Sequence, residues 1–159
     1  MRFPVPPAPP PPVSDLDAHL GFRLRAVSNH VSQAFAGKLA GQGVTTAEWV
    51  VLRALYGAPP TPPSQLAARL GLTRGAITRL ADRLIAKALL TRTASAEDKR
   101  AQTLALTLAG TALVPALAAL ADQNDADCFG LLTPAERAGL EDLLARIATH
   151  CRITATPVE

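Results

Sequence analysis

The stretch LAARLGLTRGAITRL, residues 66–80, has the pattern of a helix-turn-helix, in which two short helices pack closely around a tight turn. Such packing requires a small residue inside the first helix, a glycine at the turn and an apolar anchor in the second helix. Ala67, Gly71 and Ile77 meet these requirements. An ordinary helical hairpin is the alternative. The residues that we expect to complete the buried set are Leu66, Leu70, Leu72 and Leu80.

The second helix of this motif presents a polar face that is suited to duplex DNA. Thr73 is expected to cap its N-terminus, and Gly75, which has no side chain, allows this end to approach base edges closely. Arg74 and Arg79 can each donate paired hydrogen bonds to guanine, which favour the correct base by about 1–3 kcal/mol. For Arg79 alone, a solvent-facing arginine is the alternative. The residues of this helix that we predict to contact DNA are Thr73, Arg74, Gly75, Thr78, Arg79 and Arg83.

The stretch DKRAQTLALT, residues 98–107, places charged residues at the tip of a predicted hairpin. Residues 89–93 and 103–107 are expected to be strands that flank the polar loop ASAEDKR. A hairpin that follows a DNA-reading helix is a wing, and we predict that Lys99 and Arg100 lie along the phosphates or enter a narrow minor groove. Asp98 is a poor DNA ligand. We expect it to stabilise the wing, either by pairing with Arg100 or by capping the loop.

The charge of the chain supports a polyanionic partner for this region. The 159 residues carry a net charge of +3, but residues 61–107 contain eight basic and three acidic residues, which gives +5 there and −2 elsewhere. A cationic segment between acidic flanks favours double-stranded DNA as the partner of that segment. A solvated basic face is the alternative interpretation.

A long amphipathic helix is predicted before this region. Large apolar side chains recur every three or four residues from Leu16 to Leu39, which predicts a helix of roughly 25 residues that starts near Ser14. Such a helix is long for a small domain and needs a partner surface. We therefore expect it to form part of a homodimer interface.

Capping signals mark further helices. The sequences Thr45-Thr46-Ala47-Glu48 and Thr133-Pro134-Ala135-Glu136 are capping boxes, and Thr107 is expected to cap the helix that follows the wing. Pro115 inside that helix is expected to bend it or to delay its start, because proline removes a hydrogen bond and clashes with the preceding turn. The last helix is predicted to carry Leu140, Leu143, Leu144 and Ile147 on one face.

These elements predict a mainly α fold, a winged helix-turn-helix with a two-stranded β wing and with N- and C-terminal dimerisation helices. We divide the chain into a proline-rich arm (1–13), a helical dimerisation region (14–43 and 108–150), a DNA-binding region (44–107) and a tail (151–159). The arm has seven prolines in residues 4–12, which favours an extended conformation.

The chain resembles the multiple-antibiotic-resistance-repressor (MarR) family of winged-helix regulators. The segments that carry the resemblance are LAARLGLTRGAITRLADRLIAKALLTR, residues 66–92, and DKRAQTLALTLAG, residues 98–110. The resemblance implies a two-fold dimer that binds a pseudo-palindromic operator and is released when a small molecule or an oxidant acts on it. It also assigns Asp98 and Arg100 to the wing roles of the family. The proline-rich arm and Pro115 depart from the family pattern.

Members of this family often accept small aromatic acids between the dimer helices and the DNA-binding lobe. A carboxylate requires a cation or an amide donor, and a ring requires an apolar wall. We therefore expect a small aromatic carboxylate as effector, and a repressor that it releases from DNA. The candidate effector-binding residues are Arg23, Arg25, Asn29, His30 and Trp49. For Trp49 a packing role in the core is the alternative, and for His30 a surface position.

Two other functions are considered. An oxidation-sensing regulator requires a reactive cysteine, but Cys128 and Cys151 lie near the start and the end of the last helical segment, whereas redox-sensing relatives place theirs in the first helix. A winged helix used only for docking to another protein is the second alternative.

The sequence lacks the residues that several other classes of function require. A phosphate-binding glycine loop, a nucleophile elbow and paired carboxylates in an apolar setting are absent, so we do not expect an enzyme. No cysteine or histidine cluster predicts a metal site, and we expect no cofactor. A signal peptide and a membrane-spanning run are also absent, so a cytoplasmic protein without a membrane partner is expected.

Overall fold

The computed structural model of the chain describes residues 13–94 and 102–153, which form mainly helices. The predicted mainly α fold with a two-stranded wing is confirmed. The elements in chain order are η1 (Leu16–Ala18), α1 (Leu20–Ala40), α2 (Thr46–Leu55), α3 (Pro63–Leu70), α4 (Arg74–Ala86), β1 (Leu90–Ala94), β2 (Gln102–Leu106), α5 (Leu108–Phe129) and α6 (Pro134–His150).

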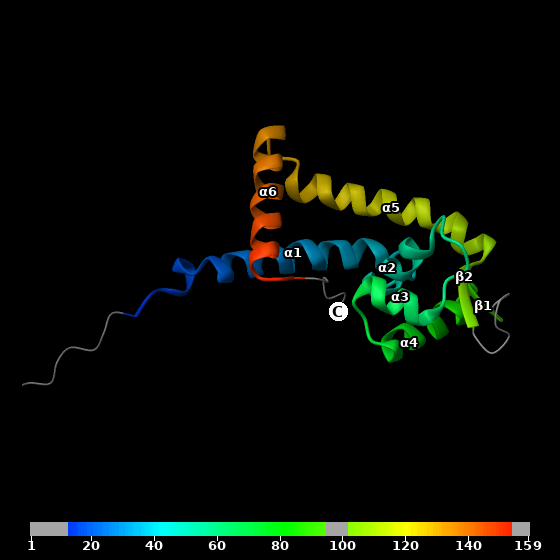
Figure 1. Cartoon of the computed structure of the whole chain (residues 1–159). Helices are drawn as coiled ribbons and strands as arrows, with labels where there is room; N and C mark the ends of the chain where they lie inside the picture. Colours follow the sequence, from blue (N-terminus) through cyan, green and yellow to red (C-terminus); the bar gives the residue numbers. More distant parts are fainter. Residues whose placement is uncertain (1–12, 95–101, 154–159) are drawn as a thin grey trace, which may run out of the picture.

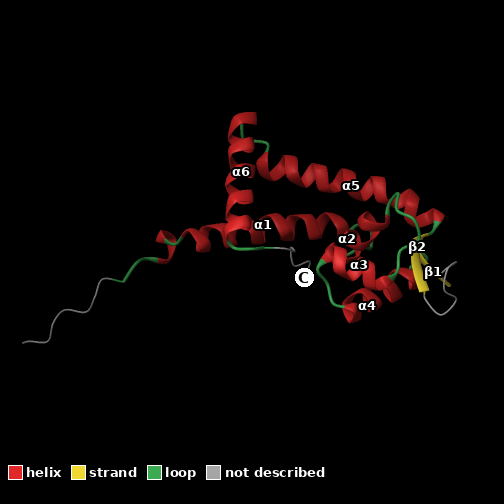
Figure 2. Ribbon diagram, in the orientation of Figure 1, coloured by secondary structure: helices red, strands yellow, loops and turns green. Residues whose placement is uncertain are grey.

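Two long helices, α1 and α5, run side by side through the molecule (Figure 1). At one end of this pair, α2, α3, α4 and the β1–β2 hairpin form a lobe, and at the other end α6 turns away from α5. Figure 2 shows the hairpin at the outer edge of the lobe, beyond α3 and α4. The long helices therefore carry the helix-turn-helix and the wing as one unit.

The core lies mostly inside this lobe. Leu52 of α2, Leu66 of α3, Ile77 and Leu84 of α4, and Leu104 of β2 are fully buried and belong to one apolar cluster. Burial of each such side chain stabilises the fold by about 1.5–3 kcal/mol. The apolar face of α4 thus holds this helix in the lobe, and its polar face is left free.

The helix-turn-helix is confirmed, with one correction to its predicted buried set. Leu66, Ala67, Ile77 and Leu80 are buried, and Leu70 and Leu72 are partly buried. Gly71, however, is exposed, so its predicted place in the buried set is wrong. Gly71 ends α3 with φ +65, a left-handed conformation that glycine adopts without the cost that a Cβ imposes. Its contribution is to the turn and not to the packing.

Each wing strand is offset by one residue from its prediction. Leu90 pairs with Leu106 and Ala94 with Gln102 in an antiparallel register. The predicted end residues Leu89 and Thr107 lie outside the strands, because the Leu89 amide closes the turn after α4 by donating to Leu84 and Thr107 caps α5. Thr61 adds an isolated bridge to Leu104, which ties the segment before α3 to the wing.

The flanking helices differ from prediction at two points. The first predicted helix is interrupted, because His19 is extended (φ −88, ψ 116) between η1 and α1. Pro115 does not delay α5, which starts at Leu108 because the Thr107 hydroxyl accepts a hydrogen bond from the Gly110 amide at 3.0 Å. The bend at Pro115 remains a prediction.

Both predicted capping boxes are formed. The Thr45 hydroxyl accepts from the Glu48 amide, and the Glu48 carboxylate accepts from the Thr45 amide. Thr133 and Glu136 make the same pair of bonds at the start of α6. Each box satisfies two amides that would otherwise lack a partner, so both helix starts are fixed locally.

Candidate nucleic-acid interface

The exposed face of α4 carries the side chains predicted to read DNA. Thr73 is the N-cap, and its hydroxyl accepts from the Ala76 amide at 3.2 Å. The Thr78 hydroxyl donates to the Arg74 carbonyl at 2.9 Å, so its proton is already used and it is best placed to accept from a base. The residues of this face that are exposed are Thr73, Arg74, Gly75, Thr78, Arg79, Asp82 and Arg83.

The arginines of α4 are free to meet an anion. Within the part of the chain that the structure describes, no carboxylate lies within ion-pair distance of Arg74, Arg79 or Arg83. A Cβ built on Gly75 would lie 3.7 Å from Nη1 of Arg79, which is an ordinary contact. Gly75 therefore lies directly beside the Arg79 guanidinium, which has no ion-pair partner among the described residues.

An ion pair that the sequence did not predict joins α4 to the wing. Nη2 of Arg92 on β1 donates to Oδ1 of Asp82 on α4 at 2.8 Å. Both residues were counted in the charge of residues 61–107, and no contact between them was predicted. The spacing of ten residues across a helix end and a turn gives no periodic signal for this contact.

The predicted tip of the wing lies outside the described residues. Asp98, Lys99 and Arg100 fall between Ala94 and Gln102, the two wing residues that the structure places on either side of the loop. Their roles in stabilising the wing and in holding DNA remain predictions. What the structure places is the base of the wing, next to α4.

A second unpredicted ion pair joins the residue that follows α4 to a buried carboxylate of α2. Nζ of Lys87, the residue that follows α4, lies 2.7 Å from Oε2 of Glu48, whose side chain is only 1% exposed. Burial alone raises the pKa of Glu48, but hydrogen bonds from Lys87 and the Thr45 amide, together with the charges of Lys87 and Arg83, outweigh it and lower that pKa. Glu48 is thus held ionised.

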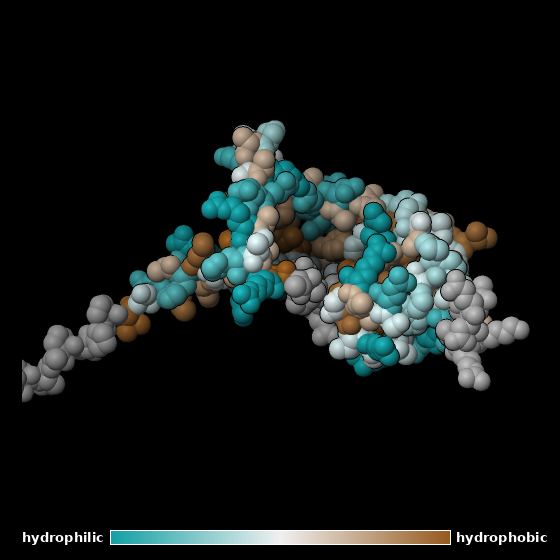
Figure 3. Space-filling model, viewed as in Figure 1, coloured by the Kyte–Doolittle hydropathy of each residue, from teal (hydrophilic) through white to brown (hydrophobic). Residues whose placement is uncertain are grey.

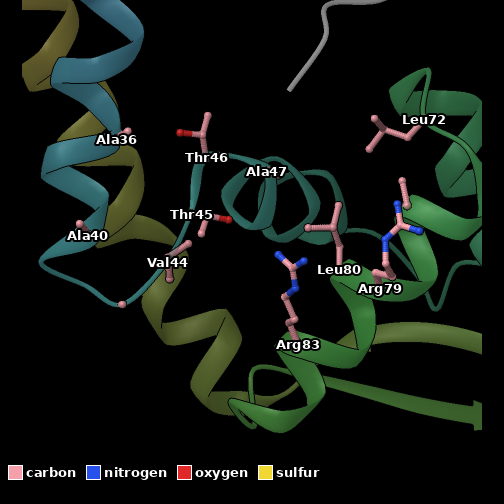
Figure 4. A pocket seen from close by; sticks show the side chains of 12 residues that line it. Ala36, Ala40, Val44, Thr45, Thr46, Ala47, Leu72, Arg79, Leu80 and Arg83 are labelled. Carbon is pink, nitrogen blue, oxygen red and sulfur yellow. The ribbon is translucent and has the colours of Figure 1, made fainter. Parts of the chain in front are cut away.

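A groove of about 490 Å³ lies between the C-terminal end of α1, the start of α2 and α4. Figure 4 shows Arg79 and Arg83 extending from α4 toward this space, with Val44 and Thr45 across from them. Its walls are mostly apolar, and its cations come from the helix that carries the predicted DNA contacts. The other lining residues are Ala36, Ala40, Gly43, Thr46, Ala47, Leu72, Ala76 and Leu80.

The structure does not bring the five predicted effector residues together. Arg23, Arg25, Asn29 and His30 are exposed on the N-terminal half of α1, and Nε of Arg23 donates to the Asp17 carbonyl at 2.7 Å. Trp49 is half-buried in α2 and packs edge-to-face on Phe35, with ring centroids 6.4 Å apart. Trp49 lines a separate, shallow groove of about 410 Å³ with Arg53 and Arg69. None of the five lines the groove beside α4.

The cysteines lie away from α4. Cys128 is half-buried near the end of α5, and Cys151 is exposed after α6. The described residues contain no cluster of three or more potential metal-binding side chains. In the same parts of the chain, no helix has the length and apolar character that crossing a membrane requires.

Comparison with known proteins identifies the family. Residues 42–101, which contain the helix-turn-helix and the first strand of the wing, match the MarR family model. A structure from Pseudomonas aeruginosa, a "probable transcriptional regulator", is 30% identical with a TM-score of 0.75, and the match covers 84% of this chain and 99% of that one. The chain belongs to the MarR family. It is a MarR-family transcriptional regulator with the winged-helix fold.

Two other solved structures are similar. A cysteine-to-serine variant of MarR from E. coli, complexed with operator DNA, is 29% identical with a TM-score of 0.73 over 80% of this chain and 92% of that one. BpsR of Bordetella bronchiseptica, whose DNA binding is regulated by 6-hydroxynicotinic acid, is 26% identical with a TM-score of 0.75 over 86% of this chain and 98% of that one.

Proposed function

We propose that this MarR-family regulator binds a pseudo-palindromic DNA operator as a homodimer, represses transcription in the cytoplasm and is released by a small aromatic carboxylate. The observation that carries the proposal is the exposed face of α4, where Arg74 and Arg79 have no ion-pair partner among the described residues. The related MarR from E. coli has been crystallised with operator DNA, which supports duplex DNA as the ligand.

The proposal gives each exposed group of α4 a role. Arg74 and Arg79 read guanine edges in the major groove, and the Thr73 cap orients the first turn that carries them. Arg83 follows Gly75 by about two helical turns of α4. It contacts the phosphate backbone. Lys99 and Arg100 are expected to add wing contacts, with Asp98 supporting their loop.

Homodimer formation is supported by apolar side chains that the monomer leaves exposed. None of the residues of α6 is buried, and Leu143 and Ile147 are among its exposed apolar side chains. Figure 3 shows further apolar surface along the N-terminal part of α1, where Leu20 and Leu24 are exposed. Contiguous apolar surface of this kind marks an interface, and a second copy that covers α1 and α6 accounts for it.

The groove beside α4 is the better effector site of the two that have been considered. Arg83 and Arg79 supply the cations that a carboxylate requires, and Val44 and Leu80 supply apolar walls. The α1 candidates Arg23 and Arg25 are spread over an exposed helix. Regulation of BpsR by 6-hydroxynicotinic acid supports an aromatic acid as the ligand class. An acid in the groove would draw Arg79 and Arg83 away from DNA.

Selection from a random duplex library tests DNA binding and repressor geometry. We expect enrichment of inverted half-sites whose centres lie about one helical turn apart, and an affinity for them that falls steeply with salt. Footprinting on the DNA that flanks its own gene then locates the operator. No enriched duplex, or an affinity that is insensitive to salt, contradicts the proposal and favours a protein-docking module.

Calorimetric titration with substituted benzoic and nicotinic acids tests the effector and its site. We expect binding that Arg83→Met abolishes and that Arg23→Met leaves intact, together with release of the selected duplex by the same acids. Loss of binding in Arg23→Met alone would return the site to α1. If no acid of the panel weakens DNA binding, the aromatic-carboxylate proposal is wrong.

A further inference from the structure

Three consecutive residues at the C-terminal end of the DNA-reading helix, Lys87, Ala88 and Leu89, are held from two sides, and we call them the elbow. On the first side, Nζ of Lys87 donates to both carboxylate oxygens of Glu48, at 2.9 and 2.7 Å, and to the Gly43 carbonyl at 2.8 Å. Lys87 therefore joins the elbow to α2 and to the loop between α1 and α2.

The second side of the elbow is fixed to the start of α5. The Thr107 hydroxyl donates to the Ala88 carbonyl at 2.7 Å, and the Thr107 amide donates to the Leu89 carbonyl at 3.1 Å. Gly110 approaches so closely that a Cβ added to it would lie 2.1 Å from the Leu89 carbonyl oxygen. Ala88 has φ +56, a conformation that a non-glycine residue keeps only where its surroundings hold it.

The elbow is placed where a small rotation has a large effect on DNA recognition. Arg74 lies thirteen residues before Lys87 on one continuous helix, which corresponds to a distance of roughly 20 Å. A rotation of about 10° at the elbow moves the Arg74 end by about 3.4 Å, which is the rise of one base pair. Fixing the elbow thus fixes which base pair the arginines of α4 meet.

We propose that Glu48 and Lys87 are positioning residues for DNA recognition, which set the angle of α4 against the long helices and thereby the half-site spacing that the protein accepts. The inference rests on the proposed function, because spacing has a meaning only for a DNA-binding dimer. Neither side chain touches DNA in this role. Lys87 acts through the direction of α4, and Glu48 acts through Lys87.

The positioning role can be separated from a contribution to stability. Replacing a buried ion pair by neutral side chains of similar shape is often neutral or stabilising, whereas removing one partner leaves an uncompensated charge. Glu48→Gln keeps a carbonyl that can accept from the Thr45 amide, and Lys87→Met keeps the apolar stem. The double variant therefore removes the electrostatic clamp and keeps the capping oxygen and the packing.

The test uses the full chain and duplexes from the library selection. Four proteins are compared: wild type, Glu48→Gln with Lys87→Met, the conservative Lys87→Arg, and a control with Lys38→Met and Asp127→Asn. The control removes the same two charges from an ion pair between the C-terminal end of α1 and α5. Each protein is titrated with the selected duplex and with duplexes in which one base pair is inserted or deleted between the half-sites. Urea unfolding and amide hydrogen exchange are measured without DNA.

We expect the wild type, Lys87→Arg and the control to prefer the selected spacing by about tenfold, and the double variant to prefer it by less than about threefold at an unchanged urea midpoint. Amides of residues 87–89 should exchange faster in the double variant alone. A correctly folded double variant that keeps tenfold discrimination overturns the inference. Unchanged hydrogen exchange at residues 87–89 in the double variant also overturns the inference. This measurement needs no DNA, so it still tests the inference if none of the proteins binds a duplex. Absence of duplex binding by the wild type contradicts the proposed function.

Discussion

Arg92, near the start of the wing, donates a 2.8 Å hydrogen bond to the carboxylate of Asp82, so the strand that leads into the wing is joined to α4 through their side chains. The pair lies on the exposed side of α4, next to the arginines proposed to read DNA. We expect this carboxylate to have two functions. It would orient the base of the wing through Arg92, and its negative charge would oppose the approach of phosphate.

Asp82→Ala should separate these two functions. Both side chains are partly exposed, 56% for Asp82 and 30% for Arg92, so the loss in free energy of unfolding should stay below about 1 kcal/mol. Removal of the negative charge should strengthen binding to random duplex, while the less constrained wing lowers the ratio of specific to random binding. Gel shifts with selected and scrambled duplexes measure that ratio. An unchanged ratio would show that the ion pair has no part in recognition.

Arg79 and Lys99 should differ in the kind of binding that they contribute. Arg79→Ala should cost about 1–3 kcal/mol at the selected site and relax the base preference there, because a paired contact to a base is lost. Lys99→Ala should weaken binding to all duplexes alike and flatten the salt dependence by about one unit, because a phosphate contact is lost. Titrations at several salt concentrations distinguish the two. Equal effects from both variants would contradict this division.

The Thr73 cap should matter to DNA binding as well as to stability. Thr73→Ala leaves the Ala76 amide without its side-chain acceptor and should cost about 1 kcal/mol of stability. The same change at Thr133 removes an equivalent cap from α6. Urea unfolding should show similar losses, and a weaker affinity for the selected duplex is expected for Thr73→Ala alone. Thr73→Ser keeps the hydroxyl and should preserve both properties.

Glu48 should make the stability of the fold depend on pH. Its pKa is lowered from the ordinary value of 4.5, so the stabilising contribution is present above that value and is lost as the pH falls through the lowered folded pKa. Urea unfolding from pH 7 to pH 3 should therefore show a steeper loss for the wild type than for Glu48→Gln with Lys87→Met. Parallel curves for the two proteins would contradict a carboxylate that is held ionised.

Much of the fold could be predicted because its signals are local. Thr45 and Thr133 start helices through bonds to residues three positions away, and the apolar spacing around Ile77 places the buried face of α4. The polar face that carries Arg74 and Arg79 follows from the same periodicity. The sequence also favoured an anionic partner through the concentration of positive charge in residues 61–107.

The predictions that failed involve competition between local signals and packing. Gly71 was predicted to form the turn and to belong to the buried set, and it does only the first, because its left-handed backbone ends α3 at an exposed position. Thr107 was predicted to end the second strand and also to cap the next helix; the structure places it outside the strand, and its hydroxyl caps α5. The five effector candidates were chosen by chemical type and remain a prediction, and the groove that Trp49 lines contains none of the four candidates of α1.

By itself the sequence determined the order of the helices, their caps and the face of α4 that meets solvent, since these depend on residues within a few positions of one another. Only the tertiary structure decided that Lys87 reaches Glu48 across 39 residues, that Arg92 pairs with Asp82, and that Arg79 and Arg83 border a groove. These contacts depend on the angle at which α4 packs on α2 and the wing. Close packing of the core brings α4 against α2 and the wing, and no single stretch of sequence specifies that packing.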